Sequence, residues 1–173
     1  MDTRPTTHRY GTSRSFGIAG AVLFLGGFVC GWAEQPPSIR ATNRDQSQVV
    51  VNPSQALIFP EQRWNLVAPN PFGATVAVWS VEPFQNVNDR QIRVDAALDL
   101  ATSGRGRKSD WKIIAAYDRT DFGHGKSLAQ VAAGSEGGNG QVGITVSFLG
   151  HEQPFLAEGE YEATVIGTIS EGF

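Results

Sequence analysis

Two carboxylates near the C-terminal end, Glu160 and Glu162, have a spacing that suits glycoside hydrolysis in principle. On an extended strand, alternate residues share one face and lie about 7 Å apart. Paired acids at such a distance can act as general acid and as base or nucleophile on a glycosidic bond. Acidic side chains on the outward face of a strand are also common surface decoration. We therefore interpret this pair as solvent-facing and predict that the protein is not an enzyme.

A serine, a histidine and an aspartate also lie near one another in the sequence, as Ser109 or Ser127 with His124 and Asp118. Such a set could activate a serine for acyl transfer, but geometry and not sequence proximity defines a catalytic triad. The Gly-x-Ser-x-Gly pattern, which holds a nucleophilic serine on a strained turn, does not occur. The sequence therefore predicts no catalytic residue.

Residues of the types that bind metal ions are spread along the chain. Asp118, Asp121 and Glu136 could meet around calcium if their loops are neighbours, because carboxylates and loop carbonyls suit that ion. No ligand spacing typical of a metal motif joins them, and His124 and His151 stand alone in separate loops. No complete phosphate-binding motif occurs either. We predict neither a metal site nor a cofactor.

Tryptophan side chains offer the remaining chemistry, because an exposed indole can stack against a sugar ring. Trp79 and Trp111 fall inside apolar alternating segments, so we expect them to fill the core, where large aromatic side chains bury the most surface. Trp64 is the candidate for ligand stacking. A small secreted carbohydrate-binding module that uses Trp64 is the alternative function that the sequence leaves open.

Residues 1–33 have the order of an export signal. Three arginines precede an apolar run over residues 18–29, and the small residue Ala33 stands before Glu34. The run is too short for a membrane-spanning helix, which needs roughly 20 apolar residues. We predict a signal helix, cleavage between Ala33 and Glu34, and a product in the periplasm, at the cell surface or outside the cell. Cleavage would remove Cys30, the only cysteine, so we expect no disulfide in the mature protein.

The chain after the predicted signal is acidic. It has 11 basic and 16 acidic residues, and such a surface does not favour nucleic acid or an anionic membrane. Residues 34–48 are polar and show no hydrophobic period, so we predict a flexible, disordered leader. Residues 49–173 have a length typical of one domain with its own core.

Nearly every apolar segment after the leader alternates with a period of two, as a half-buried strand does. The clearest are residues 92–100, 111–117, 142–148 and 161–169, whereas residues 73–81 are apolar on both faces, which is typical of a central strand. Turn residues separate these segments. The pattern predicts an all-β fold, an antiparallel β-sandwich of immunoglobulin-like type, with a closed barrel as the alternative. The side chains expected inside are Val94, Leu98, Ile144, Val146 and Val165.

The C-terminal segment Leu156-Ala157-Glu158-Gly159-Glu160-Tyr161 leads into an alternating strand that reaches Ile169. A signal, a polar leader and a β domain with such a closing strand resemble bacterial surface sandwiches of the WxL and the spore-coat or pilin-like kinds. The resemblance covers about residues 49–173 and implies a non-catalytic structural role at the cell surface or in an appendage. It implies partners among envelope or surface proteins, another copy of this chain included, with a glycan as the alternative ligand.

Overall fold

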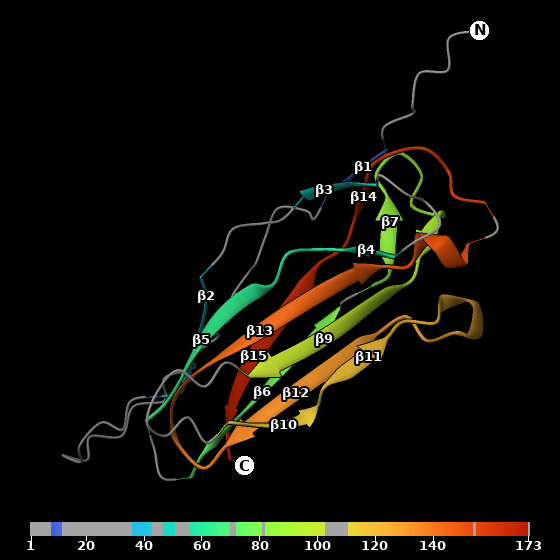
Figure 1. Cartoon of the computed structure of the whole chain (residues 1–173). Coiled ribbons are helices and arrows are strands. Elements are labelled where there is room, and N and C mark those ends of the chain that lie inside the picture. Colours follow the sequence, from blue (N-terminus) through green and yellow to red (C-terminus); the bar gives the residue numbers. More distant parts are fainter. Residues whose placement is uncertain are drawn as a thin grey trace, which may run out of the picture.

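The computed structural model describes residues 8–11, 36–42, 47–50, 56–69, 72–80, 82–102, 111–153 and 155–172, with the backbone alone for 8–11 and 47–50 (Figure 1). Within these ranges the chain forms antiparallel strands and two short 3-10 helices, and no α-helix. The strands belong to open sheets and not to a closed barrel. The predicted all-β, antiparallel fold class is therefore confirmed.

The largest sheet is built around one long strand, β13 (Gly138–Phe148). Because β13 has 11 residues, it pairs with β9 on one side and with both β5 and β4 on the other. The sheet runs from β11 (Tyr117–Arg119) through β9 (Ala96–Thr102), β13 and β5 (Gln62–Ala68) to β2 (Ser38–Ala41), with β4 (Leu57–Ile58) beside the end of β13. Its outermost strands are thus β11 and β2.

The second sheet has four strands, in the order β10 (Lys112–Ala115), β12 (Ala129–Ser135), β6 (Ala74–Ser80) and β15 (Val165–Glu171). The interior position of β6 confirms the central strand predicted over residues 73–81. One of its faces is fully buried, at Ala74, Val76, Val78 and Ser80, while the side chains between them are half-buried. The outermost strands of this sheet are β10 and β15.

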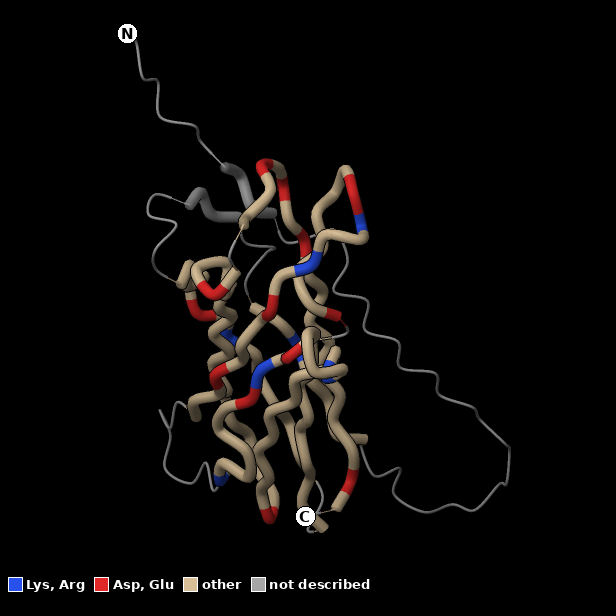
Figure 2. Tube along the Cα trace, turned by 90° about the vertical axis from the view of Figure 1, so that its right-hand side faces the viewer, with Lys and Arg blue, Asp and Glu red and all other residues tan. Residues whose placement is uncertain are grey.

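Two smaller sheets and two 3-10 helices complete the described chain. A three-stranded sheet contains β14 (Tyr161–Glu162), β7 (Phe84–Asn86) and β8 (Arg93–Val94), and β1 (His8–Gly11) pairs with β3 (Ser47–Val50). The 3-10 helices are η1 (Phe122–His124) and η2 (Gly150–Glu152). In Figure 2 the charged residues gather toward the end of the molecule opposite the C-terminus.

One hydrophobic core lies between the inward faces of the two larger sheets. Aliphatic side chains from alternate positions of β5, β6, β9, β12 and β13 fill it, as strand periodicity requires. The five side chains predicted inside are all buried: Val94, Leu98, Ile144, Val146 and Val165. The alternation in the sequence therefore identified the inward faces correctly in these strands.

An aromatic cluster closes one end of this core. Phe84 stacks on Phe59 with ring centres 5.7 Å apart and meets the edge of Phe148 at 5.1 Å, and Phe148 meets Tyr161 at 5.4 Å. The hydroxyl of the buried Tyr161 donates a hydrogen bond to the carbonyl of Ala157 at 3.0 Å. The ring is therefore buried without loss of the phenol's hydrogen bond.

Two segments that the alternation predicted as single strands each divide between two sheets. Residues 92–100 form β8 and β9, with the break at Asp95, and residues 161–169 form β14 and β15, with the break at 163–164. In both cases one strand belongs to the three-stranded sheet and the next to a larger sheet. A hydrophobic period of two reports which face is buried, but the same period suits either sheet.

The segment 111–117 departs further from the prediction, because a β-bulge shifts its alternation. Ile113 pairs with Ala133 but Ala115 pairs with Ala132, so Ala115 no longer shares a face with Ile113. The chain then crosses from the four-stranded to the six-stranded sheet between β10 and β11. As a result Tyr117, which the alternation places on one face with Trp111 and Ile113, lies opposite the exposed Asp99, and Asp118 lies opposite the buried Leu98.

The predicted N-terminal segments fall largely outside the described residues. Within the leader predicted as flexible over residues 34–48, residues 38–41 form β2 and pair with β5, which corrects that part of the prediction. Ile39 and Ala41 of β2 pack against the core, and this apolar contact outweighs the polar composition of the segment. Of the predicted signal, 1–33, only residues 8–11 are described, as strand β1; the cleavage site at Ala33 and Glu34 lies outside the described residues.

Candidate interaction surface

Exposed apolar side chains gather on one flank of the molecule. Nine large apolar side chains are exposed among the described residues, and five of them lie between residues 113 and 128: Ile113, Ile114, Tyr117, Phe122 and Leu128. Strands β10 and β11, which follow one another along this side in Figure 1, are the outermost strands of the two larger sheets. We call residues 112–128 the β10–β11 flank.

The two isoleucines of β10 are exposed for different reasons. Ile113 shares the inward face with Ala133, but it lies at the rim of the sheet, where no further strand of the four-stranded sheet covers it among the described residues. Ile114 lies on the opposite face of the same edge strand and is 57% exposed. An edge strand also presents backbone donors and acceptors that can pair with another chain. The flank thus combines an apolar surface with an available strand edge.

Asp118 joins the two larger sheets across this flank. Its carboxylate accepts a hydrogen bond from the backbone N–H of Gln130 in β12 at 2.9 Å, and it also receives the ammonium group of Lys126 and the backbone N–H of Arg119. The pairing of β10 with β12 ends at Ala132, two residues before it would reach Gln130. The carboxylate of Asp118 therefore accepts the backbone N–H of Gln130 in place of a β10 carbonyl. The carboxylate thus ties β11 of the six-stranded sheet to β12 of the four-stranded sheet.

These hydrogen bonds change the ionisation of Asp118. Partial burial raises the pKa of its carboxyl group, but the hydrogen bond from Lys126 and the backbone N–H groups of Gln130 and Arg119 favour the charged form more strongly. The pKa of Asp118 therefore lies below its ordinary value of 3.8. The charged carboxylate is part of the folded structure.

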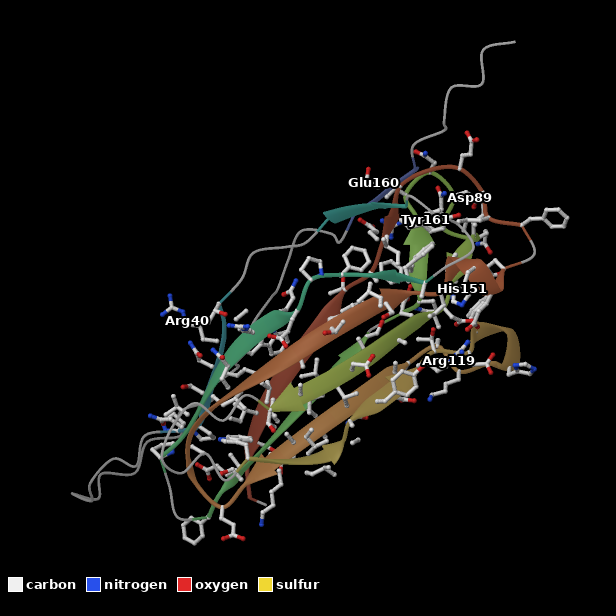
Figure 3. The ribbon with its side chains drawn as sticks, viewed as in Figure 1. Arg40, Asp89, Arg119, His151, Glu160 and Tyr161 are labelled. Atoms are coloured by element: carbon white, nitrogen blue, oxygen red, sulfur yellow. The ribbon has the colours of Figure 1, made fainter. Side chains whose placement is uncertain are left out.

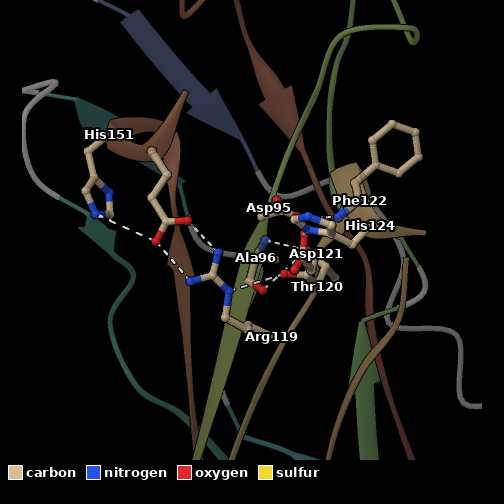
Figure 4. Close-up of polar contacts among 9 residues, drawn as sticks. Asp95, Ala96, Arg119, Thr120, Asp121, Phe122, His124 and His151 are labelled. Carbon is tan, nitrogen blue, oxygen red and sulfur yellow. Dashed lines mark hydrogen bonds and ion pairs between the residues drawn. The ribbon is translucent and has the colours of Figure 1, made fainter. Parts of the chain in front are cut away.

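A second polar group fixes the loop that follows β11 (Figure 4). The buried carboxylate of Asp95 accepts a hydrogen bond from the hydroxyl of Thr120 at 2.6 Å and another from the backbone N–H of Phe122 at 2.9 Å. The same hydroxyl accepts the backbone N–H of Ala96 at 2.9 Å. Asp95 thus holds η1 against the junction of β8 and β9, where the predicted single strand is interrupted.

An ion pair holds β11 to the other 3-10 helix. The guanidinium of Arg119 donates two hydrogen bonds to the carboxylate of Glu152, one of them 3.0 Å long. His151 lies 4.0 Å from the same carboxylate, and Figures 3 and 4 show it beside this pair. On the other side of the loop, the guanidinium of Arg93 lies 4.8 Å from the ring centre of Phe122. These contacts with neighbouring strands and loops hold β11 and the following loop in place.

His124 and Asp121 form the most exposed pair of the loop. The ring Nδ1 of His124 lies 2.7 Å from a carboxylate oxygen of Asp121. This hydrogen bond raises the pKa of His124 above its ordinary value of 6.5 and lowers the pKa of Asp121. The pair has the chemistry of a base and its orienting acid, but both side chains are solvent-exposed.

The structure does not bring together the residues considered for catalysis and for metal binding. Asp118 bonds to Lys126 and not to His124, and Ser109 lies outside the described residues. Glu136, considered with Asp118 and Asp121 for calcium, lies 3.9 Å from Lys112. In the described part of the chain, no three His, Cys, Asp or Glu side chains are placed to hold a metal ion.

The remaining sequence candidates have structural surroundings of their own. Glu162 lies 3.7 Å from Arg90, and Glu160 is exposed beyond it. The candidate for sugar stacking, Trp64, is only 4% exposed and packs against Gly167, so the expectation of an exposed platform there is wrong. A ring enclosed between two sheets cannot stack on a sugar in solvent. Trp111 is buried as predicted, and Trp79 is half-buried.

Sequence reasoning missed the flank itself. Ile114 and Ala116 are apolar at positions where the alternation of this segment calls for polar residues. That is the signal that could have indicated an edge strand with two apolar faces. The role of Asp118 has no such signal, because it depends on the β-bulge and on the position of Gln130 in another strand.

Comparison with protein families, with curated proteins and with solved structures finds no match to this chain. Among the residues that the structure describes, no helix is long and apolar enough to cross a membrane.

Proposed function

We propose that this protein is an exported, non-catalytic β-sandwich of immunoglobulin-like type that acts through protein contacts, as a cell-surface or appendage-like subunit. The observation that carries the proposal is the β10–β11 flank, where exposed Ile113, Ile114 and Tyr117 lie on the outermost strands of both larger sheets. Clustered apolar surface on a soluble domain is typical of an interaction site. A strand edge beside it offers backbone hydrogen bonds to a partner strand.

The surroundings of the flank support a contact surface more than a catalytic one. Asp118, Asp95 and Arg119 hold the flank through hydrogen bonds to neighbouring strands and loops, so a partner would meet a preformed surface. Export is supported by the order of residues 1–33 in the sequence. The lead-in to the last strand, with the Tyr161 hydroxyl bonded back to Ala157, is typical of the tyrosine corner in immunoglobulin-like sandwiches.

The test uses crosslinking from a defined position in the purified full-length chain. A photoreactive residue in place of Ile114 should give covalent dimers or larger adducts, and Ile114→Lys should abolish the association seen by sedimentation velocity, because a charge on an edge strand opposes pairing. The same changes at Ile58 are the matched control, since Ile58 is 61% exposed against 57% for Ile114 but lies on β4.

Adducts at position 114 that do not form at position 58 support assembly of copies through the flank. A chain that remains monomeric at all concentrations and gives no adduct at position 114 would contradict the proposal for self-assembly. Equal adducts at both positions would indicate non-specific association of exposed apolar residues, and would contradict it as well.

A further inference from the structure

A hollow of about 370 Å³ lies between the three-stranded and the four-stranded sheets. The chain passes between these sheets twice, from β6 to β7 and from β14 to β15, and both passages contribute to the lining. Pro83 and Ala163 supply apolar surface from the two passages, and Ile166 adds more from β15. The size falls within the range of small-ligand sites, which begins at about 300 Å³.

Charged groups surround this apolar surface. Glu82 comes from the first passage and Glu162 from β14, while Arg90 reaches the hollow from the turn between β7 and β8. Arg90 and Glu162 are 3.7 Å apart, and the Arg90 side chain is 74% exposed. An exposed ion pair at such a distance contributes little to stability, because solvent screens the two charges. Glu162 is therefore available to a better donor.

We propose that this hollow binds a primary alkylammonium group, the chemistry of a lysine side chain or of a free alkylamine. The ammonium would donate hydrogen bonds to the carboxylates of Glu82 and Glu162, and its hydrocarbon stem would cover Pro83 and Ile166. The site goes beyond the proposed function, because none of its lining residues belongs to the β10–β11 flank.

The balance of charge favours a cation over an anion. Two glutamates and one arginine are among the residues that line the hollow, and further acidic residues lie at the same end of the molecule, where Figure 3 shows Asp89 and Glu160. Such a surface attracts cations and repels anions. A divalent metal ion is less suitable, because the guanidinium of Arg90 would be next to it and no trio of metal-ligating side chains is found in the described residues.

The test is a titration of the full-length chain at low salt, followed by amide chemical shifts in two-dimensional NMR. The probe is Nα-acetyl-lysine-N-methylamide, and saturable shifts centred on Gln85, Arg90 and Thr164 are expected. The uncharged Nα-acetyl-norleucine-N-methylamide, which has a similar stem, should produce none. Cadaverine distinguishes the two sources of the ammonium, because tighter binding of cadaverine points to a free amine and tighter binding of the blocked lysine to a protein side chain.

Two variants change the affinity in opposite directions. Glu162→Gln should weaken binding by at least about tenfold, the typical value of one charged hydrogen bond. Arg90→Ala should strengthen binding by up to roughly fivefold, because it removes the competing cation. Glu158→Gln, a matched change on an acid that does not line the hollow, should leave the affinity unchanged.

Three results would overturn the proposal. The first is the absence of saturable shifts, and the second is equal binding of lysine and norleucine derivatives. The third is preferential binding of Nα-acetyl-glutamate-N-methylamide that Arg90→Ala abolishes, which would make the hollow an anion site. These outcomes are independent of association through Ile114.

Discussion

The two flanks of the paired sheets differ in how their apolar rims are covered. At one flank β2 and β15, the outermost strands of the two larger sheets, contact each other. Their rim side chains Ile39, Ala41 and Ile169 are half-buried against the core. At the other flank Ile113, Ile114 and Tyr117 of β10 and β11 remain exposed. Figure 3 shows Arg40 of β2 and Arg119 of β11 on opposite sides.

The difference follows from what joins the sheets at each flank. On the β2–β15 flank the indole of Trp64 fills the space over Gly167, and a methyl group at that position would come within 1.5 Å of the ring. On the β10–β11 flank the connection is polar, through the carboxylate of Asp118 and the N–H of Gln130. The apolar contact leaves the rim side chains of one flank half-buried, whereas the polar bridge leaves the apolar neighbours Ile113, Ile114 and Tyr117 exposed. The open flank is therefore the one available to a partner.

Removal of the closing strand should have the largest effect on the β2–β15 flank. Deletion of residues 161–173 eliminates β14 and β15, and with them the pairing along β6 and the buried rings and aliphatic chains of Tyr161 and Val165. We expect an unfolded chain, because an apolar face and a full ladder of hydrogen bonds are lost together. Far-ultraviolet circular dichroism and a urea titration measure this. A truncated chain that still unfolds cooperatively would show that this flank does not depend on β15.

A smaller change at the same flank should still be costly. Gly167→Ala places a methyl group against the indole of Trp64, so the ring must move in a packed interior, and we expect the free energy of unfolding to fall by about 1 to 3 kcal/mol. Gly123→Ala is the matched control, because the nearest atom to its added methyl group is 4.0 Å away. Urea denaturation gives the free energy of unfolding of both variants for comparison. Equal stability of the two would mean that the Trp64 contact does not close the flank.

The hydrogen bond from the backbone N–H of Gln130 to the carboxylate of Asp118 should contribute less to the free energy of unfolding than the contact between Trp64 and Gly167. Asp118→Ala leaves the N–H of Gln130 without its acceptor and Lys126 without its partner. We expect a loss of about 1 to 2 kcal/mol in the free energy of unfolding. Asp99→Ala, which removes an exposed acid from the neighbouring β9, should stay within about 0.5 kcal/mol of the unaltered protein. A larger loss at Asp99 than at Asp118 would contradict the bridge.

The same bridge predicts a pH dependence. Because the pKa of Asp118 is lower in the folded protein than its ordinary 3.8, its contribution to stability is present above pH 3.8 and is lost as the pH falls through the folded pKa. Asp118→Asn lacks this titration. The difference in unfolding free energy between the two proteins should therefore shrink in acid, and a difference that stays constant there would exclude the ionised bridge.

The smallest expected effect concerns the exposed end of the β10–β11 flank. Asp121→Asn weakens the hydrogen bond that raises the pKa of His124, so this pKa should fall toward 6.5 in an NMR titration. The pair stabilises the fold below pH 6.5, and this contribution disappears as the pH rises through the folded pKa of His124. An unchanged His124 titration in the variant would show that the pair is not formed in solution.

The alternation of apolar residues predicted the all-β class and the buried faces correctly, from Leu98 in β9 to Ile144 in β13. It could not predict that residues 92–100 divide at Asp95, because the carboxylate there is bound by Thr120 and Phe122, which are distant in sequence. The sequence also left Trp64 as the candidate for ligand stacking, although its side chain is buried. Its burial depends on Gly167, more than a hundred residues later.

What the sequence by itself determined was local: which residues are extended, which face of each strand is apolar, and where the chain turns. Those properties depend on side-chain type and on a period of two. The tertiary structure decided the rest, because pairing and closure depend on residues far apart in the chain. A one-residue bulge between Ile113 and Ala115 turned Asp118 inward and Tyr117 outward. In that way a segment with the pattern of an ordinary half-buried strand became the exposed flank of the molecule.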